Sequence, residues 1–110
     1  MQLQQVILNL LLNACDAISV VQSGPRTLAV ATDHDGQGLV IVTVRDSGVG
    51  VSESELTGIF EPFVTTKPQG LGMGLAISRS IVEAHKGRIW ATRNDDHGLT
   101  VHVELPIWAT

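Results

Sequence analysis

The sequence is poor in cysteine, in aromatic rings and in charged residues. Its 110 residues include 1 Cys, no Tyr, 2 Phe and 2 Trp, and 16% of them are charged. A single cysteine excludes an internal disulfide framework and any multi-cysteine metal site, and it is compatible with a reducing compartment, with the cytoplasm as the default. Because rings are so few, the core must be built mainly from Val, Ile, Leu and Ala.

The sequence also lacks basic runs and long apolar runs. The formal net charge is −4 and the 7 Lys and Arg residues form no cluster, which disfavours nucleic acid and an anionic membrane surface as direct partners. Its longest apolar stretch, residues 6–12, is interrupted by Asn9, so it is too short for a membrane span of about 20 residues. We expect one domain over residues 1–110, since this is the size of a single compact unit.

Apolar periodicity and breaker residues predict three helices. The first covers residues 2–20 and ends before a Ser-Gly-Pro cluster. A capping box over residues 52–55 starts a short second helix that Pro62 stops. The third is expected over residues 75–86, after a glycine-rich loop, with Gly87 as its C′ residue.

Alternating β-branched residues around turn-forming clusters predict two hairpins. One pairs residues 27–32 with 39–46, and the other pairs residues 88–93 with 99–106. Hairpins and helices are therefore grouped along the chain. That order predicts an α+β fold, a two-layer sandwich with helices on one face of a mixed, mostly antiparallel sheet.

The first predicted helix carries a narrow polar strip. At 100° per residue, four polar side chains fall within about 80° of one another on an otherwise apolar helix: Gln5, Asn9, Asn13 and Asp16. The strip either faces solvent or bonds to backbone, or it lines a pocket whose side-chain oxygens hold a hydrated Mg²⁺. Phosphate-binding features elsewhere would favour the pocket.

A glycine-rich segment, residues 70–74, precedes the third predicted helix. It offers backbone N–H groups beside a positive helix end, which suits an anion, although glycines also precede helices for structural reasons. It is neither a dinucleotide fingerprint, since no parallel strand leads into it, nor a P-loop, since no Gly-Lys-Ser/Thr closes it. Lys67, three residues earlier, is either an exposed charge or a cation for a terminal phosphate.

Asp46 ends an apolar strand and is followed by Gly48 and Gly50. One interpretation is a turn-forming aspartate. The other is a carboxylate that accepts a hydrogen bond from the exocyclic amine of a flat ligand, which the two glycines allow to approach the backbone.

These features follow one another in an order that resembles a known family. Four segments resemble the N box, first glycine box, F box and second glycine box of the sensor histidine kinase ATP-binding domain: Asn9-Leu-Leu-Leu-Asn13-Ala, Asp46-Ser-Gly-Val-Gly50, Phe60-Glu-Pro-Phe63 with Thr65-Thr66-Lys67, and Gly70-Leu-Gly-Met-Gly-Leu75. The resemblance covers nearly the whole chain. It implies the Bergerat fold, which is shared with DNA gyrase, the mismatch-repair ATPases and the heat-shock chaperone ATPases.

The resemblance implies roles for the residues that match. Asn13 matches the Mg²⁺ ligand, and Asn9 matches the second asparagine near the metal and the phosphates. Asp46 matches the aspartate that accepts from the adenine amine, with Gly48 and Gly50 beside the base.

Further positions match the phosphate end of the family's site and its last strands. Lys67 matches a phosphate-binding cation, and Thr100 matches a position near the adenine. The phosphate-cradling glycines and neighbouring amides match five positions: Gly70, Leu71, Gly72, Gly74 and Leu75.

Two positions of the polar strip depart from the family. Gln5 stands where many members have a glutamate proposed as general base, and a glutamine cannot take a proton near pH 7, so the identity of the base is left open. Asp16 stands where many members have a basic residue, and in related ATPases an acid here is linked to the site through water.

As a whole, the resemblance implies a protein histidine kinase domain that binds Mg²⁺ and ATP and donates the γ-phosphoryl group to a histidine. Asn9 and Lys67 would assist the transfer. None of the 4 histidines lies in a His-Glu-x-x-x-Pro pattern on a helix, so we expect a fragment whose phosphoacceptor and dimerisation domain lies upstream. The implied partners are that domain, a response regulator and a second copy of the full-length kinase. Alternatives are an anti-sigma serine kinase, another Bergerat ATPase, or a nucleotide-binding module without catalysis.

Overall fold

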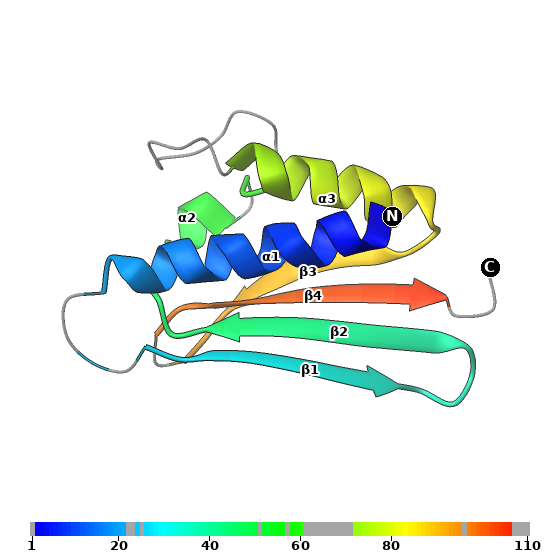
Figure 1. Cartoon of the computed structure of the whole chain (residues 1–110), viewed down its shortest axis with the longest axis horizontal. Helices are drawn as coiled ribbons and strands as arrows, with labels where there is room; N and C mark the ends of the chain where they lie inside the picture. The colour runs from blue at the N-terminus through cyan, green and yellow to red at the C-terminus, as the bar shows by residue number, and fades with distance from the viewer. Residues whose placement is uncertain are drawn as a thin grey trace.

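The computed structural model describes residues 2–21, 24, 26–50, 52–56, 58–60, 72–95 and 97–106. Its elements follow one another as the sequence predicts: α1 (Gln2–Ser19), β1 (Leu28–His34), β2 (Leu39–Asp46), α2 (Glu53–Leu56), α3 (Gly72–Ala84), β3 (Arg88–Arg93) and β4 (Leu99–Pro106). Figure 1 shows the helices together on one side of the sheet, which confirms the predicted α+β layering.

The sheet has the strand order β1-β2-β4-β3. Each predicted hairpin forms, and β2 pairs with β4 between them, so every pairing among the described strands is antiparallel. Val44 lies opposite Val30 on one side and Val101 on the other. The pairing of β2 with β4 therefore brings the end of the first hairpin beside the start of β4.

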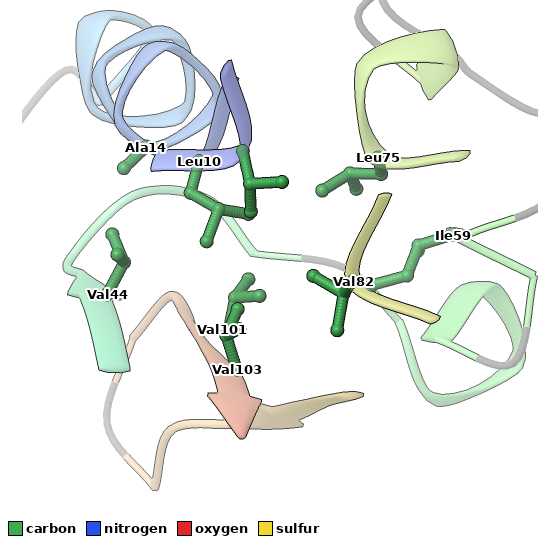
Figure 2. Close-up of a cluster of buried hydrophobic side chains, with 9 residues drawn as sticks. Leu10, Ala14, Val44, Ile59, Leu75, Val82, Val101 and Val103 are labelled. Atoms are coloured by element: carbon green, nitrogen blue, oxygen red, sulfur yellow. The ribbon is translucent and has the colours of Figure 1, made fainter. Parts of the chain in front are cut away.

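Aliphatic side chains fill the space between the helices and the sheet. Val82 and Val103 are fully buried, and Leu10 and Val44 are 1% and 2% exposed. Figure 2 shows side chains from α1, α3, β2 and β4 meeting in this cluster. Each such burial stabilises the fold by about 1.5–3 kcal/mol, so the scarcity of aromatic rings is compensated by many small contacts.

Helix α1 is amphipathic, with one buried side that faces this core. Its buried residues recur at helical spacing: Val6, Leu10, Ala14 and Ala17. Leu8 and Leu12 point the other way and are about half exposed. Among the described residues, no helix combines the length and apolar character that crossing a membrane requires.

The start of α3 lies three residues before the predicted one. The sequence predicted a loop up to Gly74, whereas α3 begins at Gly72, so Gly72 and Gly74 belong to its first turn. Packing of Leu75, which is 8% exposed, outweighs the weak helix propensity of the two glycines. The short helix α2 begins after Ser52 as predicted, and the Ser52 carbonyl accepts from the Leu56 N–H at 3.0 Å, but α2 ends at Leu56, well before the predicted stop at Pro62.

The end of α3 also differs from the prediction. The left-handed C′ residue is Lys86, with φ of 64°, and not Gly87. The Lys86 N–H donates to the carbonyl of Glu83 at 3.0 Å, and the Gly87 N–H donates to that of Val82 at 2.9 Å, which is a Schellman motif. Gly87 is needed for a different reason, because a Cβ there would lie 2.2 Å from the backbone oxygen of Glu104.

The sheet face opposite the helices carries a stacked pair of rings. Trp90 and His102 lie parallel, with centroids 5.0 Å apart, and His102 Nε2 lies 2.9 Å from the Thr92 hydroxyl. Arg88 lies over the Trp90 ring and also pairs with Glu104 at 3.3 Å. Burial lowers the pKa of His102, which disfavours the charged form of this ring.

Two single variants at the end of α3 test these different requirements at positions 86 and 87. Gly87→Ala should lower the free energy of unfolding by about 1–3 kcal/mol, because the new methyl group collides with β4. Lys86→Gly should raise it by about 1 kcal/mol, because glycine adopts the left-handed conformation without strain. Urea titrations of both variants measure the effect, and a loss of stability in Lys86→Gly would contradict it.

Candidate functional site

Asp46, the last residue of β2, is a buried carboxylate that is 6% exposed. The backbone N–H of Gly48 donates to its Oδ1 at 2.8 Å, which fixes the orientation of the carboxylate. The loop then touches α1, since a Cβ at Gly48 would lie 2.6 Å from the Cβ of Ala17. No other residue fits at position 48 without moving α1 or the loop.

The turn between β3 and β4 covers Asp46 from the other side. A Cβ at Gly98 would lie 2.0 Å from the Asp46 carbonyl oxygen and 2.8 Å from its Oδ1. Gly50, with φ of 69°, lies less close to the turn, since a Cβ there would lie 3.2 Å from the Gly98 oxygen. These glycines thus allow one backbone segment to approach another closely. That Gly48 and Gly50 lie beside an adenine ring remains a prediction.

Asn94 connects this turn to the end of β2. Its Nδ2 donates to the carbonyl oxygens of Asp46 at 2.9 Å and of His97 at 2.8 Å. Its Oδ1 accepts from the Thr100 hydroxyl, and its backbone N–H donates to Gly98 O at 3.1 Å. Sequence reasoning missed Asn94, because an asparagine at the start of a hairpin turn is common for purely local reasons.

Thr100, which the resemblance places near the adenine, lies beside this network. It is paired with Arg45, one residue before Asp46. Val101 and Val103 point into the core, so the alternation along β4 puts Thr100 on the opposite face of the sheet. The structure therefore links Thr100 to Asp46 through Asn94 and does not bring the hydroxyl against the carboxylate.

The polar strip of α1 faces α3 at its centre. Asn9 Nδ2 donates to the Ser78 hydroxyl at 3.4 Å, and Gln5 Nε2 donates to Asn9 Oδ1 at 3.2 Å. Ser78 is fully buried, whereas Gln5 is exposed. Sequence reasoning missed Ser78 too; its signal is a serine three residues after Leu75 and four before Val82, on the buried side of α3.

Asn13 and Asp16 lie further along the same helix, and both are half-buried. Asn13 is one turn before Ala17, so its side chain projects on the same side of α1 as the residue that contacts Gly48. Within the part of the chain that the structure describes, no hydrogen bond joins the Asn13 amide to another residue. The fold thus brings Asn13 and the Asp46 loop to one region.

The donor set in this region suits a hard cation that needs few protein ligands. In the described ranges, no group of three or more His, Cys, Asp or Glu side chains could hold a metal. Mg²⁺ usually keeps several waters and takes the rest of its ligands from one or two side chains and from phosphates, which the Asn13 oxygen fits. Asn9 fits less directly, because its Oδ1 already accepts from Gln5.

Several predicted phosphate-binding residues lie outside the described residues: Lys67, Gly70 and Leu71. Their predicted roles remain predictions. Gly72 and Gly74 lie in the first turn of α3, as described above, where the first backbone N–H groups of a helix have no intrahelical partner. Leu75 instead packs into the core.

A comparison with protein families and curated proteins finds close relatives. The family described as "Histidine kinase-, DNA gyrase B-, and HSP90-like ATPase" matches residues 1–109. Sensor protein FixL from Bradyrhizobium diazoefficiens is 43% identical over 96% of this chain and 20% of its own length. Sensor histidine kinase ZraS from Salmonella typhimurium is 41% identical over 98% of this chain and 22% of its own length. The chain thus spans about a fifth of these relatives.

Solved structures of histidine kinases are also similar to this chain. The nucleotide-free catalytic domain of histidine kinase ThkA has a TM-score of 0.82 and 34% identity, over 96% of this chain and 66% of that one. Full-length ShkA in complex with AMPPNP has a TM-score of 0.72 and 32% identity, over 96% of this chain and 21% of that one. The chain therefore belongs to the histidine kinase-, DNA gyrase B- and HSP90-like ATPase family and has the fold of a histidine kinase catalytic domain.

Proposed function

We propose that this chain is the catalytic domain of a two-component sensor kinase, which binds Mg²⁺ and ATP and presents the γ-phosphoryl group to a histidine of a dimerisation domain. The observation that carries the proposal is the buried Asp46 carboxylate, anchored by the Gly48 N–H. The sensor kinases among its relatives and the complex of ShkA with an ATP analogue support it.

Asp46 is suited to recognise adenine by its 6-amine. A carboxylate has about four acceptor positions, and the bond from Gly48 to Oδ1 holds the group in one orientation. Guanine carries a carbonyl oxygen where adenine carries the amine, and an acceptor facing an acceptor repels. Recognition of this kind is selective, because the wrong base leaves a buried polar group unpaired.

The phosphates would then extend from Asp46 along α1 toward the start of α3. Asn13 would supply an oxygen to Mg²⁺, and the bound ion would neutralise phosphate charge during transfer. The backbone N–H groups at the start of α3 favour an anion there, and Lys67 would add a positive charge. Positioning and neutralisation suffice for this reaction, so no covalent intermediate on this domain is required.

The phosphoryl acceptor is proposed to be a histidine outside this chain. His102 is stacked on Trp90, and His85 Nδ1 lies 2.9 Å from the Ile81 carbonyl at the end of α3. His34 and His97 lie at the end of β1 and in the β3–β4 turn. A dimerisation domain of the same kinase would supply the acceptor, and a response regulator would receive the phosphoryl group next.

Replacing the Asp46 carboxylate tests base recognition. In Asp46→Asn the amide oxygen can still accept from Gly48, so the NH₂ group turns toward the base. We expect the binding free energy of ADP to weaken by about 1–3 kcal/mol, and the ratio of ADP to GDP affinity to fall. Calorimetry with both nucleotides measures this, and Asp33→Asn, an exposed carboxylate on β1, is the charge-matched control. An unchanged ratio of ADP to GDP affinity would make Asp46 a turn residue.

Removal of the Asn13 amide tests the metal ligand. Parent protein should bind ATP more tightly with Mg²⁺ than with EDTA, and Asn13→Ala should lose most of that difference because one oxygen ligand is gone. Gln4→Ala removes an amide from the exposed side of the same helix and should bind like the parent. Equal affinity with and without Mg²⁺ in the parent would remove Asn13 from any metal site.

Autophosphorylation of the isolated chain should not occur, because its histidines lie outside a phosphoacceptor helix. Incubation with γ-labelled ATP and Mg²⁺ should leave no acid-labile label on the chain, measured after separation under alkaline conditions. Labelled phosphohistidine on this chain would contradict the assignment of the acceptor to another domain.

A further inference from the structure

The β3–β4 turn holds Asp46 through a side chain that the family resemblance does not single out. We infer that Asn94 is a positioning residue for nucleotide specificity: it fixes the Asp46 backbone, and thereby sets where the carboxylate meets the base. This inference rests on the proposed role of Asp46 in adenine binding and adds a second residue, 48 positions away in sequence, to the specificity determinant.

Asn94 supplies a hydrogen bond that the sheet does not. The register of β2 with β4 ends at Arg45 and Thr100, so Asp46 lies just beyond that ladder. At this point Asn94 Nδ2 donates to the Asp46 carbonyl at 2.9 Å. A side chain thus continues the pairing by one residue, at the residue whose carboxylate is proposed to bind the base.

The Asn94 side chain is itself held in one orientation. Both hydrogens of its Nδ2 have acceptors, in Asp46 and His97, and its Oδ1 accepts from the Thr100 hydroxyl. Aspartate has no N–H to donate, and the serine hydroxyl offers one hydrogen in place of two. Position 94 therefore requires a side-chain amide. The two carbonyl acceptors identify its nitrogen, and the Thr100 hydroxyl donor identifies its oxygen.

Two contacts bear on the position of the carboxylate, in addition to the pairing of Asp46 with Leu28 on β1. Asn94 fixes the main chain of Asp46, and the Gly48 N–H fixes its Oδ1. The β3–β4 turn packs directly against Asp46 at Gly98, since even a Cβ at that position would overlap the Asp46 carbonyl. A binding group must be held to within about 0.5 Å to discriminate between ligands, and these two contacts contribute to that constraint.

Asn94→Ala tests the inference, with the ratio of ADP to GDP affinity as the readout. We expect this ratio to fall about tenfold, because Asp46 loses the hydrogen bond that holds its carbonyl on the β4 side. Thr100→Val, which keeps the Asn94 amide but removes its hydroxyl partner, should lower the ratio less. Asp95→Ala changes an exposed residue of the same turn and should leave the ratio as in the parent. Urea titration of each variant records stability separately.

A double variant separates positioning from a structural role. If Asn94 acts through the Asp46 carboxylate, Asn94→Ala should cause no further loss of preference in an Asp46→Asn background. A merely structural residue would lower stability, or weaken both nucleotides equally, and leave the ratio unchanged in every background. That result would overturn the inference.

The outcomes for the two residues are distinguishable. An altered ratio in Asp46→Asn together with a parental ratio in Asn94→Ala contradicts the role of Asn94 alone. A parental ratio in Asp46→Asn contradicts the proposed function itself. If Asn94→Ala does not fold, Thr100→Val carries the test, and a parental ratio there overturns the inference.

Discussion

The close approach of Gly98 to Asp46 is the constraint on which the site depends. Backbone meets backbone at a distance that excludes any side chain at position 98, and Gly48 meets Ala17 of α1 in the same way on the other side of the loop. The loop after β2 is therefore clamped between α1 and the β3–β4 turn. Because α1 and β4 are themselves fixed by the aliphatic core, the Asp46 carboxylate is held by the whole fold.

The arrangement of elements could be predicted from the sequence, because helices and hairpins follow local patterns of apolar residues and breakers. The details that could not be predicted depend on distant contacts. Gly87 is of the residue type that favours the C′ position of a helix, but the residue with the left-handed conformation is Lys86. The glycine is required by the carbonyl of Glu104 on β4, 17 residues further along, which no local pattern reveals.

The candidate site was predictable to a similar degree. Asp46, Asn9 and Asn13 stand out in the sequence as polar residues in apolar surroundings, and the fold brings their elements together. Ser78 and Asn94 do not stand out, because their partners lie 69 and 48 residues away, so their contacts exist only after the helices and the sheet have packed.

The most direct measurement is a crystal structure of this chain with AMPPNP and Mg²⁺. The account predicts that the adenine 6-amine lies about 3 Å from a carboxylate oxygen of Asp46, with the Asn94 bond to the Asp46 carbonyl intact. It also predicts the amide oxygen of Asn13 about 2.1 Å from the metal. An adenine ring bound away from Asp46, or a metal held without Asn13, would contradict the account.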